Sequence, residues 1–400
     1  MSFKKKAVSI PGRVPTNVSS VPGRGPPPST GAPKAKPETT ILSHEGVKAS
    51  VQTSHPTTST GSEHLDSLLG HMGIPLGSLL LVEESGSTDF ASILLRSFAS
   101  QGVLHQRLEG NGNTKVVVVG QDDMWGKELP GVYVDKKQKK KQRVEEEESK
   151  VTVGNLSNTN KNMKIAWRYS RTAEIEQKAA EVASTDVSAN TKPNYNAVFD
   201  FTSRLMPAAS TNEVAYINPS PSQKSFLSSI ITSLEPILKQ AQESNTVVRV
   251  LFPSFLHPVI FGPNCSSPNE LMPFFHLLHN LCRKYPYTVA MMMSLPLELY
   301  PRHTAITRWI EHQSDGVLQL DPFPEHLIPD TPETSSGEKP SQGLVHIFKL
   351  PVTSEKGVMV SRRGEHAFRV GRKTFEIREF GIPIDESEAS KEDVSNPVDY

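Results

Sequence analysis

The sequence has 400 residues with 43 basic and 43 acidic side chains, so no net charge draws the whole chain toward nucleic acid or a membrane surface. Its 32 prolines and 36% hydrophobic residues are respectively high and low for a globular chain, which indicates one folded unit with disordered segments. No apolar run approaches the roughly 20 residues of a membrane-spanning helix, and the first residues lack the apolar core of a secretory signal. Two cysteines favour a reducing compartment, and we expect no membrane association.

The first 57 residues form a basic segment rich in Pro, Gly, Ser and Thr. Such a segment cannot bury enough apolar surface to offset its ordering entropy. We therefore predict a disordered arm at 1–57, with an accessory contact to nucleic acid or to a partner as the alternative. Residues 58–384 then hold the folded domain, and the acidic stretch 385–400 is predicted to be a second disordered tail.

The folded domain begins with a short amphipathic run at Leu65, Leu68 and Leu69, followed by an apolar run at Leu79–Val82. A small polar loop and a helical pattern from Phe90 come next. Strand, tight loop and helix is the layout of a phosphate-binding loop. We expect the rest of the fold to be organised around this stretch.

Lys115–Val119 is a run of β-branched residues that predicts a buried strand. Blocks of like charge follow within residues 135–150, and because such blocks repel themselves we predict a disordered insertion at about 130–162. The fold is predicted to resume with Met163–Tyr169 and a strand at Ala197–Phe201.

The second half of the chain alternates helical and strand patterns, which indicates an α/β fold with a mostly parallel sheet flanked by helices. The last strands follow one another without helices, so we expect antiparallel edge strands there. Pro236 is expected to kink or split the first of the later helices. The predicted helices are 222–244, 268–285 and 301–313, and the predicted strands are 247–252, 287–295, 316–320, 344–350 and 368–380.

A working phosphate loop reads G-x-x-x-x-G-K-[ST], because glycine amides close on the phosphates, lysine neutralises them and the hydroxyl binds Mg²⁺. Here Gly86 lies inside the loop, but Glu83 stands at the first glycine, Thr88 at the second, Asp89 at the lysine and Phe90 at the hydroxyl. Exchanging a positive for a negative charge ~4 Å from a phosphate charge shifts the interaction by roughly 8 kcal/mol at an effective dielectric of ~20. The loop is therefore predicted not to hold a triphosphate in the usual pose. We expect Asp89 to be the anion at the positive end of the following helix.

The second half of a nucleotide site is also missing. An apolar strand ending in aspartate would hold Mg²⁺, but Pro253 and Ser254 follow the strand at 247–252. The sequence contains no G-x-S-x-G, H-E-x-x-H, G-x-G-x-x-G or C-x-x-C pattern. We expect neither a catalytic residue, nor a bound metal, nor a cofactor of the chain's own.

One basic cluster falls in the folded region, near the last strands. An edge strand that carries cations against aggregation is one interpretation, and a contact to a phosphate backbone is the other. The candidate phosphate contacts in this cluster are Arg362, Arg363, Arg372 and Lys373.

An ordered series of motifs spans about residues 58–383. The motifs are STG and LLG between Ser59 and Gly70, GIPLGSLLLVEE at Gly73–Glu84, MKIAWRY at Met163–Tyr169, FDF at Phe199–Phe201, DGVLQLDPF at Asp315–Phe323, GLVHIFKLP at Gly343–Pro351 and RKTFEIREFGIP at Arg372–Pro383. Through these motifs the chain resembles the family of fourth subunits of the Elongator complex, and Arg362, Arg363, Arg372 and Lys373 become candidate tRNA contacts.

This resemblance implies a RecA-like ATPase fold that has lost its phosphate-loop residues. It also implies a hetero-hexameric ring with the fifth and sixth subunits, which joins the catalytic subunits in placing a 5-carboxymethyl-type group on the wobble uridine of tRNA. The ring is implied to bind tRNA and to release it under ATP control.

Our leading hypothesis is a non-catalytic ring subunit that handles tRNA. An active ATPase that binds ATP at an interface with a neighbouring subunit is the alternative, and a recombination or signalling paralogue of the RecA type is the third.

Overall fold

A nine-stranded sheet forms the centre of the computed structural model, which describes residues 41–108, 113–133, 195–218, 226–324, 340–354, 356–357 and 364–380. The strands from β11 to β8 are parallel to one another, and β12, β13 and β14 add an antiparallel edge. The predicted α/β fold with its mostly parallel sheet is confirmed, and it is compatible with a RecA-like fold. In spatial order the strands are β14 (Phe375–Glu379), β13 (His366–Val370), β12 (Gly343–Lys349), β11 (Gly316–Pro322), β4 (Ser78–Glu84), β10 (Val289–Pro296), β9 (Val247–Phe252), β5 (Thr114–Val119) and β8 (Val214–Ile217).

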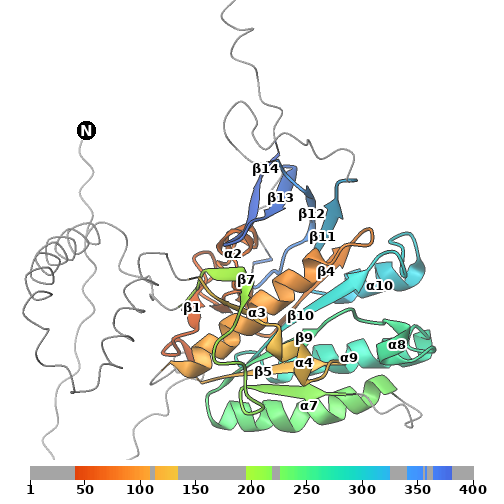
Figure 1. Cartoon of the computed structure of the whole chain (residues 1–400). Helices are drawn as coiled ribbons and strands as arrows, with labels where there is room; N and C mark the ends of the chain where they lie inside the picture. The colour runs from red at the N-terminus through yellow and green to blue at the C-terminus, as the bar shows by residue number, and fades with distance from the viewer. Residues whose placement is uncertain are drawn as a thin grey trace, which may run out of the picture. The chain divides into compact units, whose positions relative to one another are not determined.

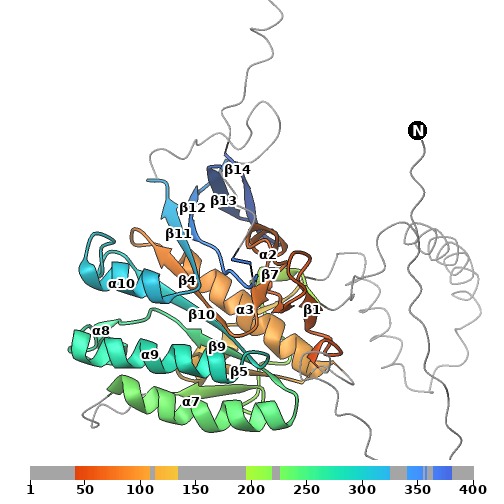
Figure 2. The ribbon, with the colours of Figure 1, turned by 180° about the vertical axis from the view of Figure 1, so that it is seen from behind.

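Helices cover both faces of this sheet (Figures 1 and 2). Successive strand residues point to opposite faces, so Leu80 and Val82 of β4 pack with one group of helices, whereas Leu79 and Leu81 pack with the other. Full burial of each leucine stabilises the fold by about 1.5–3 kcal/mol. The first face carries α3 (Phe90–Arg107), and the second carries α7 (Phe226–Glu243), α8 (Pro258–Phe261), α9 (Pro268–Lys284) and α10 (Ala305–Gln313).

Strand β4 lies in the interior of the sheet, between β10 and β11. The chain passes from β4 through α3 to β5 on one side, and it later returns to the other side of β4 at β11. Ligands of open α/β sheets bind at such a reversal of strand order, outside the carboxyl ends of the strands. The loop after β4 therefore occupies the position where the fold would hold a ligand.

Two small sheets lie outside the main one. One contains β1 (Val47–Ala49), β2 (Pro56–Thr58) and β3 (Ile74–Pro75), and the other pairs β6 (Pro130–Val132) with β7 (Phe199–Arg204). Just past β6, the amide of Tyr133 donates a hydrogen bond to the carbonyl of Val198 at 2.8 Å. The short helices α2 (Glu63–Leu68) and α4 (Asp123–Lys127) complete the described elements.

These small sheets correct two predicted boundaries. The predicted arm at 1–57 includes residues of the fold, because Ile41 and Val47 are core residues with 2% and 0% exposure. Residues 130–132, where the insertion was predicted to begin, form β6, which pairs with β7. Sequence composition does not reveal such segments, because they are ordered by pairing with strands elsewhere in the sequence. The rest of the predicted arm, insertion and acidic tail lies outside the described residues, as does Met163–Tyr169, where the fold was predicted to resume.

Other elements differ in detail. The strand predicted at 368–380 is a hairpin of β13 and β14, closed by a turn in which Gly371 N donates to Thr374 O at 2.9 Å. Helix α7 continues through Pro236, so the predicted split is wrong. Buried Leu234 and Leu238 on either side of this proline anchor the helix to the sheet. Along the described part of the chain, no helix is both long and apolar enough to cross a membrane.

Candidate functional site: the loop at the carboxyl end of β4

The loop between β4 and α3 is closed by Glu84, the last residue of β4. One carboxylate oxygen accepts hydrogen bonds from Phe90 N at 2.8 Å and from Thr88 Oγ1 at 2.6 Å, and the other accepts one from Ala91 N at 2.9 Å. The first amides of a helix have no partner within the helix, and its N-terminus carries a partial positive charge. Glu84 therefore supplies the anion at the start of α3.

Asp89 was predicted to be that anion, but the hydrogen bonds to the first amides of α3 come from Glu84. Asp89 holds the N-cap position of α3, but its side chain makes no capping hydrogen bond and is exposed. Glu84 is only 7% exposed and reaches the amides from the strand end. Glu84 therefore takes the amides of Phe90 and Ala91, whereas Asp89 makes no capping hydrogen bond to α3.

The space left beside Glu84 is small. A cavity of about 70 Å³ lies between this loop and the ends of β9 and β10. Pockets for small molecules usually enclose about 300–1,000 Å³. Ser254, which follows β9 where a magnesium-binding aspartate would stand, donates its amide hydrogen to Ser294 Oγ at 2.8 Å. The residues present therefore do not fit a magnesium–triphosphate group.

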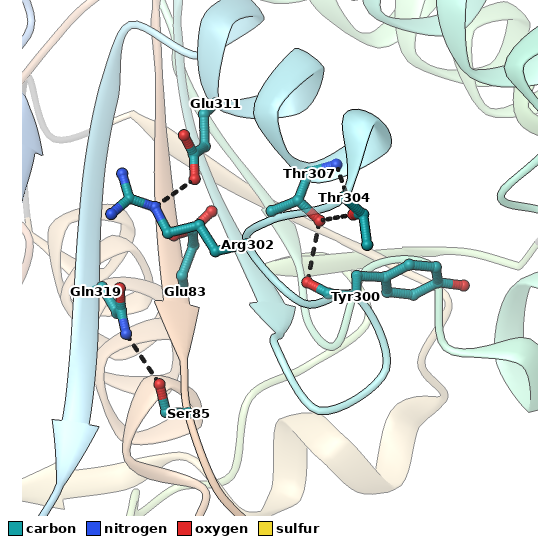
Figure 3. A network of polar contacts seen from close by, with 8 residues as sticks. All are labelled: Glu83, Ser85, Tyr300, Arg302, Thr304, Thr307, Glu311 and Gln319. Atoms are coloured by element: carbon teal, nitrogen blue, oxygen red, sulfur yellow. Dashed lines mark hydrogen bonds and ion pairs between the residues drawn. The ribbon is translucent and has the colours of Figure 1, made fainter.

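Glu83 points to the opposite face of the sheet, toward α10 (Figure 3). Its side chain has 0% exposure, and neither oxygen has a hydrogen-bond partner among the described residues. Arg302 Nε lies 3.9 Å from Glu83 and 2.7 Å from Glu311. Burial, and then the negative charge of Glu311, raise the pKa of Glu83 to about 8. Glu83, which stands where a phosphate loop has its first glycine, is therefore a buried acid that faces away from the loop.

Two further contacts fix the loop itself. Gln319 of β11 donates to Ser85 Oγ at 2.9 Å, as Figure 3 shows. Gly86 N donates to Glu298 Oε1 at 3.0 Å. In a working phosphate loop the amide of such a glycine is open to a phosphate. Here the carboxylate of Glu298 accepts this hydrogen bond, as Glu84 does at the start of α3, so acidic side chains of the protein itself hold the loop in place.

The predicted basic residues lie apart from this loop in the fold. Arg372 and Lys373 lie in the turn between β13 and β14, whereas Arg362 and Arg363 fall outside the described residues. Arg372 forms an ion pair with the buried Asp200 at 2.9 Å. The hydrogen bond from Arg372 is the main reason that the pKa of Asp200 is lowered to about 2. Of the two candidates that the structure describes, Arg372 has this acidic partner, whereas Lys373 has no acidic side chain within ion-pair distance among the described residues. The ammonium of Lys373 lies 4.0 Å from the ring centre of Tyr133.

The role of Glu84 was missed from the sequence, although a signal existed. Leu80, Val82 and Glu84 alternate along β4, so they share the face that α3 covers. A carboxylate on that face at the strand end is the one able to reach the helix N-terminus. In the described part of the chain, no three potential metal ligands cluster together.

Comparison with known proteins decides the family. The family model described as PAXNEB protein matches residues 40–398. The chain belongs to this family. Its relatives include Elongator complex protein 4 of Saccharomyces cerevisiae, which is 38% identical over 366 residues, or 87% of this chain and 78% of the relative.

More distant relatives carry the same name. Elongator complex protein 4 of Schizosaccharomyces pombe is 27% identical over 88% of this chain and 91% of its own length. The Homo sapiens protein of that name is 26% identical over 87% of this chain and 82% of its own. The family resemblance derived from the motifs is confirmed.

Proposed function

We propose that this chain is a non-catalytic subunit of the Elongator complex, present in the cytoplasm and nucleus. It assembles with the fifth and sixth subunits into a hetero-hexameric ring. That ring binds tRNA and supports the catalytic subunits in placing a 5-carboxymethyl-type group on the wobble uridine (U34). The shared name of the relatives supports membership of the complex, and the motif resemblance supports the ring and its tRNA.

The observation that carries the non-catalytic role is the carboxylate of Glu84 in the phosphate position. Two like charges ~4 Å apart repel by about 4 kcal/mol at an effective dielectric of ~20. That repulsion corresponds to about three orders of magnitude in affinity. Asp89, where a lysine would stand, adds a further negative charge to the same loop. Both groups favour a structural loop over a nucleotide-binding one.

Equilibrium binding of labelled ATP to the purified chain, and separately to the assembled ring, tests this role. We expect no micromolar binding by the chain alone. If the chain binds ATP at micromolar concentration and hydrolyses it, and if substitutions within Glu83–Asp89 abolish both, the ATPase alternative holds and our proposal fails. Binding by the ring that survives those substitutions places ATP on the other subunits.

Purification of the native complex tests the assembly. We expect Elongator subunits and tRNA to co-elute with the chain. Co-elution with DNA-repair or signalling proteins in place of Elongator subunits contradicts the proposal. Because contacts to RNA phosphates release counterions, ring–tRNA affinity should also fall steeply with salt concentration.

A further inference from the structure

Two carboxylates share one cation on the face of the sheet that α10 covers. Arg302, in the segment between β10 and α10, lies 2.7 Å from Glu311 of α10 and 3.9 Å from Glu83 of β4 (Figure 3). A hydrogen-bonded ion pair has its nitrogen and oxygen about 2.7–2.9 Å apart, so Arg302 is fully paired with Glu311 alone. These three residues, named here the Glu–Arg–Glu cluster, contain one cation fewer than they contain acids.

The rest of the described chain gives Glu83 no partner. Its side chain has 0% exposure, and neither carboxyl oxygen has a hydrogen-bond partner. The residues paired with Glu83 on the neighbouring strands are Leu295 of β10 and Gln319 of β11. Leucine offers no polar group, and the amide of Gln319 donates to Ser85 Oγ instead. Buried acids normally have a partner, because a carboxylate loses its hydration on burial, and the cluster leaves that need unmet.

The Glu–Arg–Glu cluster reaches the protein surface through Arg302. The side chain of Arg302 is 37% exposed, and that of Glu311 is 17% exposed. The guanidinium of Arg302 lies 3.1 Å from the ring centre of Phe348 of β12, and Phe348 is itself 42% exposed. A protein that approaches at this point meets an apolar ring and a carboxylate together.

The charged groups of the adjoining elements have other contacts. Asp321 of β11 and His346 of β12 face each other at 3.9 Å. Lys349 of β12 donates hydrogen bonds to two carbonyls at the end of α10, and Glu298, past β10, accepts one from the loop after β4. Within the described residues, the ion pairs of the cluster are those of Arg302 alone.

We propose that the Glu–Arg–Glu cluster is a docking point for a partner protein, which places a lysine or arginine side chain beside Phe348 and pairs it with Glu311. Arg302 then leaves Glu311 and moves about 1 Å to hydrogen-bonding distance of Glu83, which releases a proton to solvent. The docked cluster holds two carboxylates and two cations, so every charge has a partner. That the partner is an Elongator subunit rests on the proposed function.

The proton of Glu83 gives this docking a measurable signature. Burial, and then the charge of Glu311, raise the pKa of Glu83 to about 8, so the free chain holds this proton near neutral pH. Docking that releases one proton strengthens at most tenfold per pH unit below that pKa and levels off above it. Lysine and arginine keep their charge throughout this range, so the dependence belongs to Glu83.

The test measures competition within the assembled complex at pH 6.5, 7.5 and 8.5. Fluorescein-labelled chain is built into the purified complex, and unlabelled chain of each kind displaces it, with fluorescence anisotropy as the readout. Glu83→Gln keeps the shape of the buried side chain but cannot ionise, and Glu311→Gln removes the carboxylate that meets the partner. Glu243→Gln, at the exposed end of α7, is the matched control.

We expect Glu83→Gln to compete as well as the unaltered chain at pH 6.5 and about tenfold less well at pH 8.5, where Glu83 is free to ionise. Glu311→Gln should also compete about tenfold less well at pH 8.5, the loss expected for one interfacial charge pair. The control should match the unaltered chain at each pH.

The proposal is overturned if either variant competes as the unaltered chain does at pH 8.5, or if the deficit of Glu83→Gln is the same at every pH. If Glu311→Gln alters the melting temperature of the chain, Glu83→Gln decides alone. Assembly with Elongator subunits that neither variant weakens rejects the docking point and leaves the proposed function standing. If the chain assembles with other proteins instead, the proposed function fails, and a pH-dependent deficit in that assembly supports the docking point.

Discussion

Replacing Glu83 with glutamine should remove a pH-dependent weakness of the fold. The carboxyl group of Glu83 is fully buried, has no hydrogen-bond partner among the described residues and shares its surroundings with Glu311. Arg302 lies 3.9 Å away and is partly exposed, so it offsets only part of the cost of ionising this group. Glu83→Gln keeps the shape of the side chain and cannot ionise.

The sign follows from the direction of the shift. Burial raises the pKa of Glu83 from 4.5 to about 8, so between these values the folded protein holds a proton that the unfolded chain has released. Stability contributed by this proton is full below pH 4.5 and is lost as the pH rises through about 8. The loss is at most about 1.4 kcal/mol per pH unit. Allowing for Arg302, we expect Glu83→Gln to gain about 1–3 kcal/mol over the unaltered protein between pH 6 and pH 8.5.

Urea unfolding followed by tryptophan fluorescence, in steps from pH 5.5 to pH 9, measures this difference. Glu243→Gln, at the exposed end of α7, provides the control and should leave the pH dependence unchanged. The reasoning is refuted if Glu83→Gln and the unaltered protein lose stability in parallel across this range.

Three other predictions concern the loop, the β13–β14 turn and the N-terminal boundary. Glu84→Ala should cost about 2 kcal/mol by leaving the start of α3 without its anion. Millimolar inorganic phosphate should then raise its melting temperature more than that of the unaltered protein, and an equal response would contradict the role of Glu84. Arg372→Ala should destabilise the protein by about 1–3 kcal/mol at pH 7, because it leaves the carboxylate of Asp200 buried without its partner. The pKa of Asp200 is lowered from 3.8 to about 2, so this contribution is present at neutral pH and lost as the pH falls through that window. The variant should therefore match the unaltered protein near pH 2 in urea unfolding. Removing residues 1–40 should leave the melting temperature nearly unchanged, whereas removal through residue 50 should lower it, because Ile41 and Val47 each contribute about 2 kcal/mol of burial; calorimetry of the two truncations compares them.

Strong, continuous patterns were predicted well from the sequence. Val247–Phe252 is a strand with the predicted bounds, because five of its six side chains are apolar and all six are buried. Strand β8 was missed, since it has four residues and owes its order to parallel pairing with β5. Short strands such as β1 and β6 depend in the same way on distant partners, which composition cannot reveal.

The same distinction applies to the functional-site predictions: features set by residue type could be predicted from the sequence, whereas features set by packing could not. The loss of phosphate-loop chemistry follows from residue types alone, because Asp89 cannot replace a lysine. The identity of the capping acid does not, because Glu83 and Glu84 are neighbours of the same type and only the packed sheet sends them to opposite faces. A pocket of about 310 Å³ joins positions near residues 61, 199 and 373, and no local pattern connects segments so far apart.

The pairing of β6 with β7 has a consequence for how this chain can change in length. The amide of Tyr133 and the carbonyl of Val198 are hydrogen-bonded, so two positions far apart in the sequence lie side by side. For a flexible loop between two fixed ends, the entropic cost of closure grows only with the logarithm of the loop length, about 0.6 kcal/mol for each doubling. Closure entropy alone therefore sets little limit on the number of residues that join these two anchors.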